Sequence, residues 1–458
     1  MPLALQIAER ALALDRETFD PRAVKWAKDA IADMIGCTLL GANTETTDAA
    51  LNADSYAPGA CLVLGRNRRL GQLEAAFVNG TAGHALDYDD TSKSLSGHPT
   101  VIIVPGLLAL AEERDASGRD FLDAYIVGVE TATRLARGVN FHHYEKGWHP
   151  TATLGIFGAA AAAARLLGLS AEQTAHALSA CVSFASGVKA NFGTPTKPMH
   201  AGIAARNGLF AALLAKKGLA AAPGALEDRQ GFLDVFNGPG NHDAAKMLID
   251  WGQPLDLLDP GISIKKYPCV YSVHGAIDAA IALREESDVS PEAIVSVLVR
   301  MHPRRLLPHV RNPATSALNA KFSLPYAVAR GLVDGAVTLD HFEEDALHDP
   351  VVTRVMDRVV MEPLDDLTND YGAELRVTLA DGTVCMKAVT APLGRGPEVP
   401  LPPAMLAAKF ADCASRAVSA AGASEIFDML MALDGLRSMR LLTKAIEKAT
   451  SDRSGSAR

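Results

Sequence analysis

One stretch of the sequence, residues 83–100 (GHALDYDDTSKSLSGHPT), concentrates the side chains that acid–base chemistry needs. It carries His84, Asp87, Asp89, Asp90 and His98, and alanine-rich apolar segments precede and follow it. Carboxylates placed between two core-forming helices are costly unless they are paired or catalytic. The alternative is helix capping, because aspartate, threonine and serine are preferred at helix ends and a His-Pro pair can open a helix. From these residues alone, both interpretations stay open.

The motif His-Pro-Thr occurs at His98 and again at His149. A single histidine is more often a structural residue than a catalytic one. Two histidines in the same context, one of them beside an acidic cluster, favour general acid–base catalysis, because imidazole titrates near neutral pH. We therefore predict that His98 is the leading acid/base. His149 is predicted to be a second acid/base or a ligand of a substrate carboxylate.

Lysines stand in two further segments that combine charge with proline and helix starts, TKPMHAG (196–202) and IKKYPCVYSVH (264–274). Most lysines face solvent. Lys197, however, precedes a proline and a helix start, where backbone N–H groups and the helix dipole attract anions. Lys265 lies at the expected junction of two domains, where ligand clefts form. Two such lysines would bind a substrate that carries several carboxylates.

Metal binding is the alternative use of the acidic stretch. Asp87, Asp89 and Asp90 offer the oxygen ligands that Mg²⁺ prefers. The lysines favour direct charge recognition instead, so we expect neither a metal ion nor another cofactor.

The composition argues against several classes of protein. The net charge of −9 disfavours a nucleic-acid surface, which needs a basic face. The six cysteines include no CxxC pair, so neither a ribbon-type zinc site nor an iron–sulfur motif is expected, and reduced thiols suit a cytoplasmic protein. Residues 1–17 mix acids into an apolar pattern, which predicts a helix rather than a signal peptide. Charge or glycine interrupts the apolar runs, so no membrane span is expected.

Helical periodicity runs through the first half of the chain, where we predict only helices as far as residue 218. The predicted helices are 22–41, 73–83, 102–113, 121–138, 151–167, one starting at Ser170, and 203–218, with a loop at 193–202.

The pattern changes after Pro260. Residues 294–302 and 374–389 are enriched in β-branched or alternating residues, and Asp381-Gly382 predicts a hairpin turn. Helices are predicted at 274–284 and 322–331; the helical pattern returns near residue 400, and residues 451–458 are predicted to fray. We therefore predict a mainly α protein. An all-helical main domain (1–266 and 397–458) is interrupted by a smaller α+β lid domain (267–396).

Four segments, in this order, resemble the MmgE/PrpD family: ALDYDDT…GHPT, GWHPTATLGIFGAAAAAARLLGL, TKPMHAGIAARNGLFAALLAKKGL and IKKYPCVYSVHGAIDA. That family includes 2-methylcitrate dehydratase, cis-aconitate decarboxylase and iminodisuccinate epimerase. The resemblance implies a helical main domain, an α+β lid, a homodimer, and chemistry without a metal or an iron–sulfur cluster. Matched to the decarboxylase-like pattern, the implied site residues are Asp87, Thr91, His98, His149, Lys197, Lys265 and His274. The chain departs from that pattern in a slightly longer loop at 92–97 and in Thr100-Val101, where the decarboxylase has Ser-Gly.

The family members share one step, the movement of a proton at a carbon next to a carboxylate. The resemblance thus implies a cytoplasmic lyase that dehydrates or decarboxylates a small anionic polycarboxylate such as methylcitrate or aconitate. In this interpretation Lys197 and Lys265 bind carboxylates, with His274 as a further substrate contact. Asp87 and Thr91 would orient the substrate or a histidine. The alternatives are an epimerase of an iminodisuccinate-like dicarboxylate, a non-catalytic organic-acid binding protein, and a Mg²⁺-dependent lyase.

Overall fold

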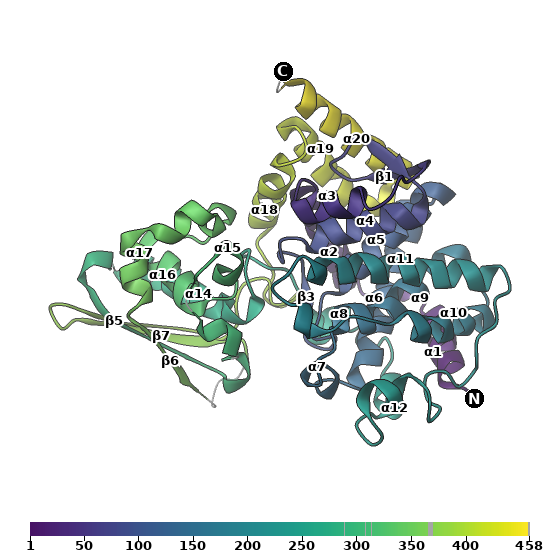
Figure 1. The fold of residues 1–458 in the computed structure, drawn as a ribbon, viewed down its shortest axis with the longest axis horizontal. Helices are drawn as coiled ribbons and strands as arrows, with labels where there is room; N and C mark the ends of the chain where they lie inside the picture. Colours follow the sequence, from purple (N-terminus) through teal and green to yellow (C-terminus); the bar gives the residue numbers. More distant parts are fainter. Residues whose placement is uncertain (288, 307, 313, 365–369, 457–458) are drawn as a thin grey trace. The chain divides into compact units, whose positions relative to one another are not determined.

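A computed structural model describes residues 1–287, 289–306, 308–312, 314–364 and 370–456 and divides the chain into two compact units (Figure 1). Unit 1 contains residues 1–264 and 402–458, and unit 2 contains residues 265–401. Within the described residues the protein is mainly helical with a small amount of strand, as predicted.

Unit 1 is built largely from helices. They are α1 (Leu3–Ala13), α2 (Pro21–Gly41), α3 (Glu45–Leu51), α4 (Gln72–His84), α5 (Pro99–Arg114), α6 (Gly118–Arg137), α7 (His142–Glu145), α8 (Pro150–Thr153), α9 (Gly155–Leu167), α10 (Ala171–Phe184), α11 (Thr196–Lys216), α12 (Phe232–Asn237), α13 (Ala244–Leu248), α18 (Pro403–Ser415), α19 (Ala420–Met431) and α20 (Met439–Ser456). Helices α4, α5, α9 and α11 pack on one another in the core of this unit. Alanine and glycine permit this close packing: a side chain on Gly202 of α11 would overlap the backbone of Phe77 in α4.

The prediction that this part of the chain is entirely helical is wrong. Strands β1 (Pro58–Val63) and β2 (Arg68–Leu70) form an antiparallel hairpin, and β3 (Thr91–Ser92) pairs with β4 (Ile262–Ser263). The first half of β1 is exposed and only its second half is buried, so the hairpin lacks the alternating pattern that predicts a strand.

Three predicted helix boundaries also need correction. The helix expected at 151–167 is broken at Leu154 between α8 and α9. Helix α11 begins at Thr196, inside the expected loop, and α20 continues to Ser456, through most of the segment expected to fray. Segment 150–167 has the length and hydropathy of a membrane span, but 83% of it is buried inside the structure, as in a core helix.

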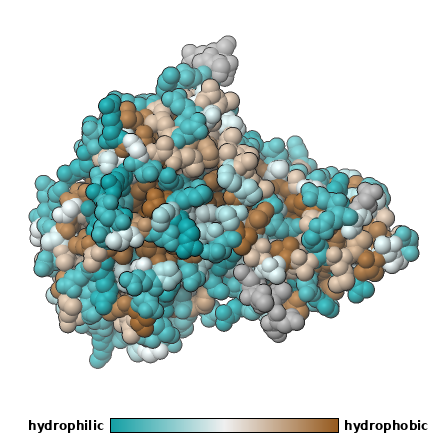
Figure 2. All heavy atoms as spheres, turned by 180° about the vertical axis from the view of Figure 1, so that it is seen from behind, coloured by the Kyte–Doolittle hydropathy of each residue, from teal (hydrophilic) through white to brown (hydrophobic). Residues whose placement is uncertain are grey.

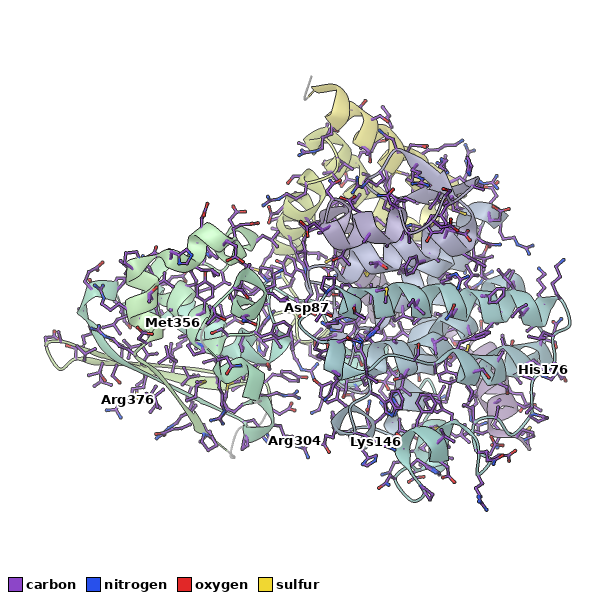
Figure 3. The ribbon with its side chains drawn as sticks, in the orientation of Figure 1. Asp87, Lys146, His176, Arg304, Met356 and Arg376 are labelled. Carbon is purple, nitrogen blue, oxygen red and sulfur yellow. The ribbon has the colours of Figure 1, made fainter. Side chains whose placement is uncertain are left out.

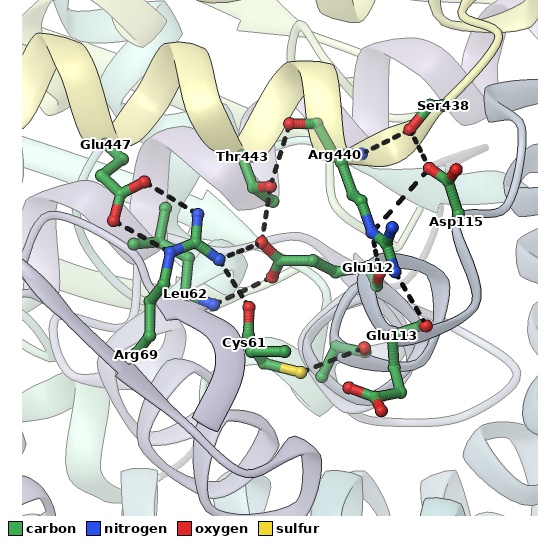
Figure 4. Close-up of polar contacts among 12 residues, drawn as sticks. Cys61, Leu62, Arg69, Glu112, Glu113, Asp115, Ser438, Arg440, Thr443 and Glu447 are labelled. Atoms are coloured by element: carbon green, nitrogen blue, oxygen red, sulfur yellow. Dashed lines mark hydrogen bonds and ion pairs between the residues drawn. The ribbon is translucent and has the colours of Figure 1, made fainter. Parts of the chain in front are cut away.

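One network of ion pairs and hydrogen bonds connects helix α20 to the β1–β2 hairpin and to α5 (Figure 4). Arg69 of the hairpin donates to Glu447 of α20 at 2.9 Å and to Glu112 of α5 at 2.6 Å. The Glu112 carboxylate is buried, and it also accepts hydrogen bonds from the Thr443 hydroxyl and the Leu62 backbone N–H. A buried carboxylate with several donors is compensated, so this network stabilises the return of the chain to unit 1.

Unit 2 combines a four-stranded sheet with helices. Its strands β5 (Ile294–Met301), β6 (Val359–Pro363), β7 (Ala373–Leu379) and β8 (Val384–Val389) form a sheet in the order β6-β5-β7-β8. Its α-helices are α14 (His274–Ser287), α15 (Ala317–Ala320), α16 (Leu324–Asp334) and α17 (Pro350–Met356). The predicted turn at Asp381-Gly382 joins β7 to β8, and Gly382 has φ = 87°, which favours glycine. The parallel edge strand β6 was not predicted. On the face shown in Figure 2, apolar residues are interspersed with hydrophilic ones.

Candidate active site

The acidic stretch forms the connection between α4 and α5. Asp87, labelled in Figure 3, lies shortly after the end of α4 and adopts φ = 54°, a left-handed conformation that aspartate tolerates better than most residues. Further along, Thr91 and Ser92 pair with β4, and the backbone N–H of Ser92 donates to the carbonyl of Gly97. The connection is therefore a loop that is closed by backbone hydrogen bonds.

A buried carboxylate lies between the two histidines of this loop. Asp89 Oδ1 and Oδ2 lie 2.9 and 3.0 Å from His84 Nδ1, and Oδ2 lies 3.2 Å from His98 Nδ1. Asp89 and His84 are almost fully buried, and the His84 and His98 ring centroids are 4.5 Å apart. Asp89 thus bridges the two imidazoles.

Lys197 adds a positive charge to the same cluster. Its ammonium group donates to Asp87 Oδ1 at 2.7 Å, and the same oxygen lies 3.6 Å from His98 Nε2. Because α11 begins at Thr196, Lys197 stands in the first turn of a helix, where the dipole favours anions. The predicted helix start is therefore present beside Lys197, although it lies inside the segment predicted to be a loop; the anion-binding role of Lys197 stays a prediction.

His149 and His200 form a second imidazole pair. Their Nδ1 atoms are 3.2 Å apart, so one ring must donate a hydrogen and the other accept it. The His149 ring also stacks on His84 with 5.9 Å between the centroids, and its edge meets Phe192. His200 lies three residues after Lys197 on α11, which places both side chains on one helix face.

The two His-Pro-Thr motifs are built alike and touch each other. His98 and His149 are the N-cap residues of α5 and α8, have similar φ and ψ angles, and are each followed by proline at the first helical position. The backbone N–H of His98 donates to Thr151 Oγ1 of the second motif at 3.1 Å. The repeated motif therefore places two histidines at adjacent helix starts.

Burial determines the protonation of most of these imidazoles. It lowers the pKa of His84 to about 4, lowers that of His149 well below its usual value, and also lowers that of His200. Burial alone would raise the pKa of Asp89, but the imidazoles of His84 and His98 hold that pKa well below its ordinary value. At neutral pH the cluster therefore contains neutral imidazoles that can accept protons beside an ionised Asp89.

Asp90 has a different role from its neighbour. Its carboxyl group accepts from the Thr100 backbone N–H and from the Thr100 hydroxyl, which in turn lies 2.6 Å from the Tyr125 hydroxyl. Burial raises the pKa of Asp90 to about 8, so this group is mostly protonated at neutral pH. Thr100, one of the departures from the decarboxylase pattern, thus belongs to a buried structural network at the start of α5.

The remaining predicted site residues are placed differently. Unit 1 brings Asp87, His98, His149 and Lys197 into the cluster, whereas the Thr91 hydroxyl donates to the Gly97 carbonyl at 3.2 Å and helps close the loop. Lys265 and His274 belong to unit 2, where both are buried and His274 packs against two tyrosines, Tyr267 and Tyr271.

Three members of the cluster were not among the predicted site residues: His84, Asp89 and His200. The pairing of His84 with Asp89 was not predicted. The three-residue spacing between Lys197 and His200 would have been the signal on a helix, but a loop was predicted there and the helix was predicted to begin at residue 203.

Metal binding is the alternative function of these side chains. His84, Asp87, Asp89 and His98 each offer one ligand atom, and these atoms lie within 4.8 Å of one another. The Lys197 ammonium is bonded to Asp87, however, and its charge would repel a cation at this position. The donor set is therefore better suited to binding an anion beside Lys197.

Comparison with known proteins identifies the family. A family model described as the MmgE/PrpD N-terminal domain matches residues 5–244, and one described as the MmgE/PrpD C-terminal domain matches residues 267–434. Cis-aconitate decarboxylase of Homo sapiens is 33% identical over 377 residues, which cover 79% of this chain and 77% of that protein. Cis-aconitate decarboxylase of Aspergillus terreus is 29% identical over 440 residues (90% and 89% covered), and 2-methylcitrate dehydratase of Cupriavidus necator is 25% identical over 410 residues (80% and 81% covered). The chain therefore belongs to the MmgE/PrpD family.

Proposed function

We propose that this protein is a lyase that decarboxylates a small polycarboxylate of the aconitate type. The observation that carries the proposal is the cluster in which neutral imidazoles and the Lys197 ammonium stand beside the ionised Asp89. Such a site can bind a substrate carboxylate and move a proton at the neighbouring carbon. The higher identity to the decarboxylases than to the dehydratase supports decarboxylation as the first candidate.

In the proposed reaction the bond between a carbon and its carboxylate breaks, carbon dioxide leaves, and the electron pair stays on that carbon. Lys197 stabilises the negative charge of a remaining carboxylate. His98 takes up a proton from solvent on Nε2 and, as the imidazolium, delivers it from Nε2 to the carbon. His149 is the second acid/base or a carboxylate contact. Lys265 and His274 of unit 2 are proposed as further substrate contacts on the basis of the family resemblance, as is a homodimer.

Dehydration is the second candidate, and the similarity to 2-methylcitrate dehydratase favours it. The same groups would then remove a proton from the carbon next to a carboxylate and protonate the departing hydroxyl group. The two reactions differ in the leaving group and not in the proton-transfer machinery.

The test supplies purified protein with cis-aconitate, 2-methylcitrate and an iminodisuccinate in separate reactions. Carbon dioxide release, water elimination and exchange of the α-proton with deuterated solvent are measured, with His98→Asn as the control protein. We expect carbon dioxide release from cis-aconitate that the control protein lacks. Binding of an acid without turnover or proton exchange would instead identify an organic-acid binding protein, and α-proton exchange with inversion alone would identify an epimerase.

A further inference from the structure

Asp89 is a buried carboxylate that lies against two imidazole side chains. It is fully buried, and its oxygens lie 2.9 and 3.0 Å from His84 Nδ1 and 3.2 Å from His98 Nδ1. The adjacent Asp90 bonds to the backbone at the start of α5 instead. Helix capping therefore explains Asp90 and does not explain Asp89.

An ionised carboxylate can only accept hydrogen bonds, so an imidazole nitrogen that bonds to Asp89 carries a hydrogen, and in both rings the nitrogen nearest to Asp89 is Nδ1. At His84 the geometry is good, and within the described part of the chain its Nε2 has no hydrogen-bond partner, as expected for a neutral ring protonated on Nδ1. At His98 the distance is suitable but the angle is less favourable, which is common at catalytic groups before substrate binds. When Nδ1 of His98 carries a hydrogen toward Asp89, Nε2 is the ring atom left to take up a proton and to deliver it.

In the Nδ1–H tautomer of His98, the free nitrogen Nε2 lies beside the charged residues of the cluster. That atom lies 3.6 Å from Asp87 Oδ1, which accepts the hydrogen bond from Lys197. Nε2 therefore faces the charged groups that would surround a substrate carboxylate. The charged and titratable groups around His98 are Asp87, Asp89, His84, His149 and Lys197.

We propose that Asp89 is a positioning residue that fixes the Nδ1–H tautomer of His98 and directs Nε2 toward the substrate, while His84 holds Asp89 in place. The proposal rests on the proposed function, because it assigns the atom through which His98 moves the proton. Asp89 itself does not need to touch the substrate.

The first test is Asp89→Asn with Asp90→Asn as its matched control. The two aspartates are adjacent and equally buried, and the substitution is the same, but the Asp90 carboxyl group bonds to Thr100 and not to an imidazole. An asparagine amide at residue 89 can donate to His98 Nδ1, which favours the opposite tautomer. We expect kcat of Asp89→Asn to fall roughly 10²–10⁴-fold with little change in KM, and kcat of Asp90→Asn to stay near the wild-type value.

The second test reads the tautomer directly and does not depend on turnover. Nitrogen NMR of the protein with ¹⁵N-labelled histidine rings, with the His98 signals assigned by their loss in His98→Asn, should show a hydrogen on Nδ1. This hydrogen should move to Nε2 in Asp89→Asn and stay on Nδ1 in Asp90→Asn.

A wild-type His98 with its hydrogen on Nε2 would overturn the proposal, even if Asp89→Asn failed to fold. So would a folded Asp89→Asn enzyme with unchanged kcat, or an equal loss of kcat in Asp90→Asn. If the wild-type protein turned over none of the acids while His98 carried its hydrogen on Nδ1, the proposed function would fail and the tautomer assignment would stand.

Discussion

At the scale of single residues, Lys197 is the positive charge that the site uses to bind an anion. Lys197→Ala should raise KM about tenfold or more, because a partly buried charge-assisted hydrogen bond is worth roughly 1.5–3 kcal/mol. Lys217→Ala, an exposed position at the end of the same helix, is the control and should leave the kinetics unchanged. Steady-state kinetics on both variants decide the matter, and an unaltered KM in Lys197→Ala would remove this lysine from the binding site.

His98 is the predicted proton donor and acceptor. His98→Asn should lower kcat by roughly 10²–10⁴-fold, because the acid/base group is lost while Lys197 still binds the carboxylate. The melting temperature should change little, since His98 makes no side-chain cap on α5. His176→Asn on α10, outside the cluster, is the matched control. A stable His98→Asn enzyme with near-native kcat would move the role to His149.

The cluster should work without a metal ion. Exhaustive dialysis against EDTA is expected to leave turnover unchanged, because the Lys197 ammonium stands where a cation would be repelled. Turnover is measured before dialysis, after it, and after addition of Mg²⁺ or Zn²⁺. Loss of activity that a metal ion restores would show that His84, Asp87, Asp89 and His98 form a metal site.

The sequence predicted those residues whose local context is unusual, and it missed those whose role depends on tertiary contacts. The repeated His-Pro-Thr motif led to His98 and His149, and the charged helix start led to Lys197. The bridge from Asp89 to two imidazoles depends on the left-handed turn at Asp87 and the closed loop after it, and no periodic pattern encodes either feature.

At the scale of elements, Gly97 lets the two His-Pro-Thr segments approach each other. A Cβ atom at this position would lie 2.7 Å from the backbone nitrogen and from Oγ1 of Thr151. Gly97→Ala should therefore separate the starts of α5 and α8, move His98, and lower kcat more than it lowers the melting temperature. Gly435→Ala is the control, since its Cβ would meet no atom within 4 Å. Equal kcat in the two variants would show that the loop tolerates the displacement.

Long helices were predicted correctly, whereas strands β1 to β4 and the edge strand β6 were not. Helices α2 and α6 follow the predicted ranges because their apolar residues recur at helical spacing. Strand β6 is an edge strand with an exposed Val360 and no alternation of buried and exposed residues. Its partner β5 lies 58 or more residues earlier in the chain, so only the folded sheet reveals the pairing.

At the scale of the whole molecule, the change of pattern after Pro260 indicated an insertion of different architecture, and the structure describes an α+β unit there. The return to helices near residue 400 was equally visible in the sequence. What holds the returning segment to the first part of the chain was not visible. The contact is made by three residues from segments far apart in the sequence, Arg69, Glu112 and Glu447. In the sequence each of them is indistinguishable from an ordinary charged surface residue.

Buried titratable groups of unit 1 should give the protein a stability maximum near pH 6.5. Burial lowers the pKa of His84 and of His143 to about 4, and also lowers the pKa values of His149 and His200. Between about pH 4 and 6.5 the unfolded chain binds protons at these histidines that the folded protein does not bind. The free energy of unfolding should therefore fall as the pH is lowered from 6.5 to 5.

Asp90 acts in the opposite sense. Its pKa is raised by burial to about 8 in the folded protein, whereas an unfolded aspartate titrates near 3.9, so between these values the folded state holds the extra proton. Stability from this group falls as the pH rises, by up to about 1.4 kcal/mol per pH unit. Below pH 6.5 the several histidines outweigh it, whereas between pH 6.5 and 8 Asp90, with a pKa of about 8, still lowers the stability as the pH rises.

Denaturant unfolding of wild-type protein and Asp90→Asn at pH 5, 6.5 and 8 separates the two contributions. The wild-type protein should be most stable at pH 6.5. Asp90→Asn cannot ionise at this position, so it should lose the decline between pH 6.5 and 8 and keep the decline between pH 6.5 and 5. If both proteins declined equally toward pH 8, the carboxyl group of Asp90 would be ionised in the folded state, and the buried network with Thr100 and Tyr125 would hold a charge.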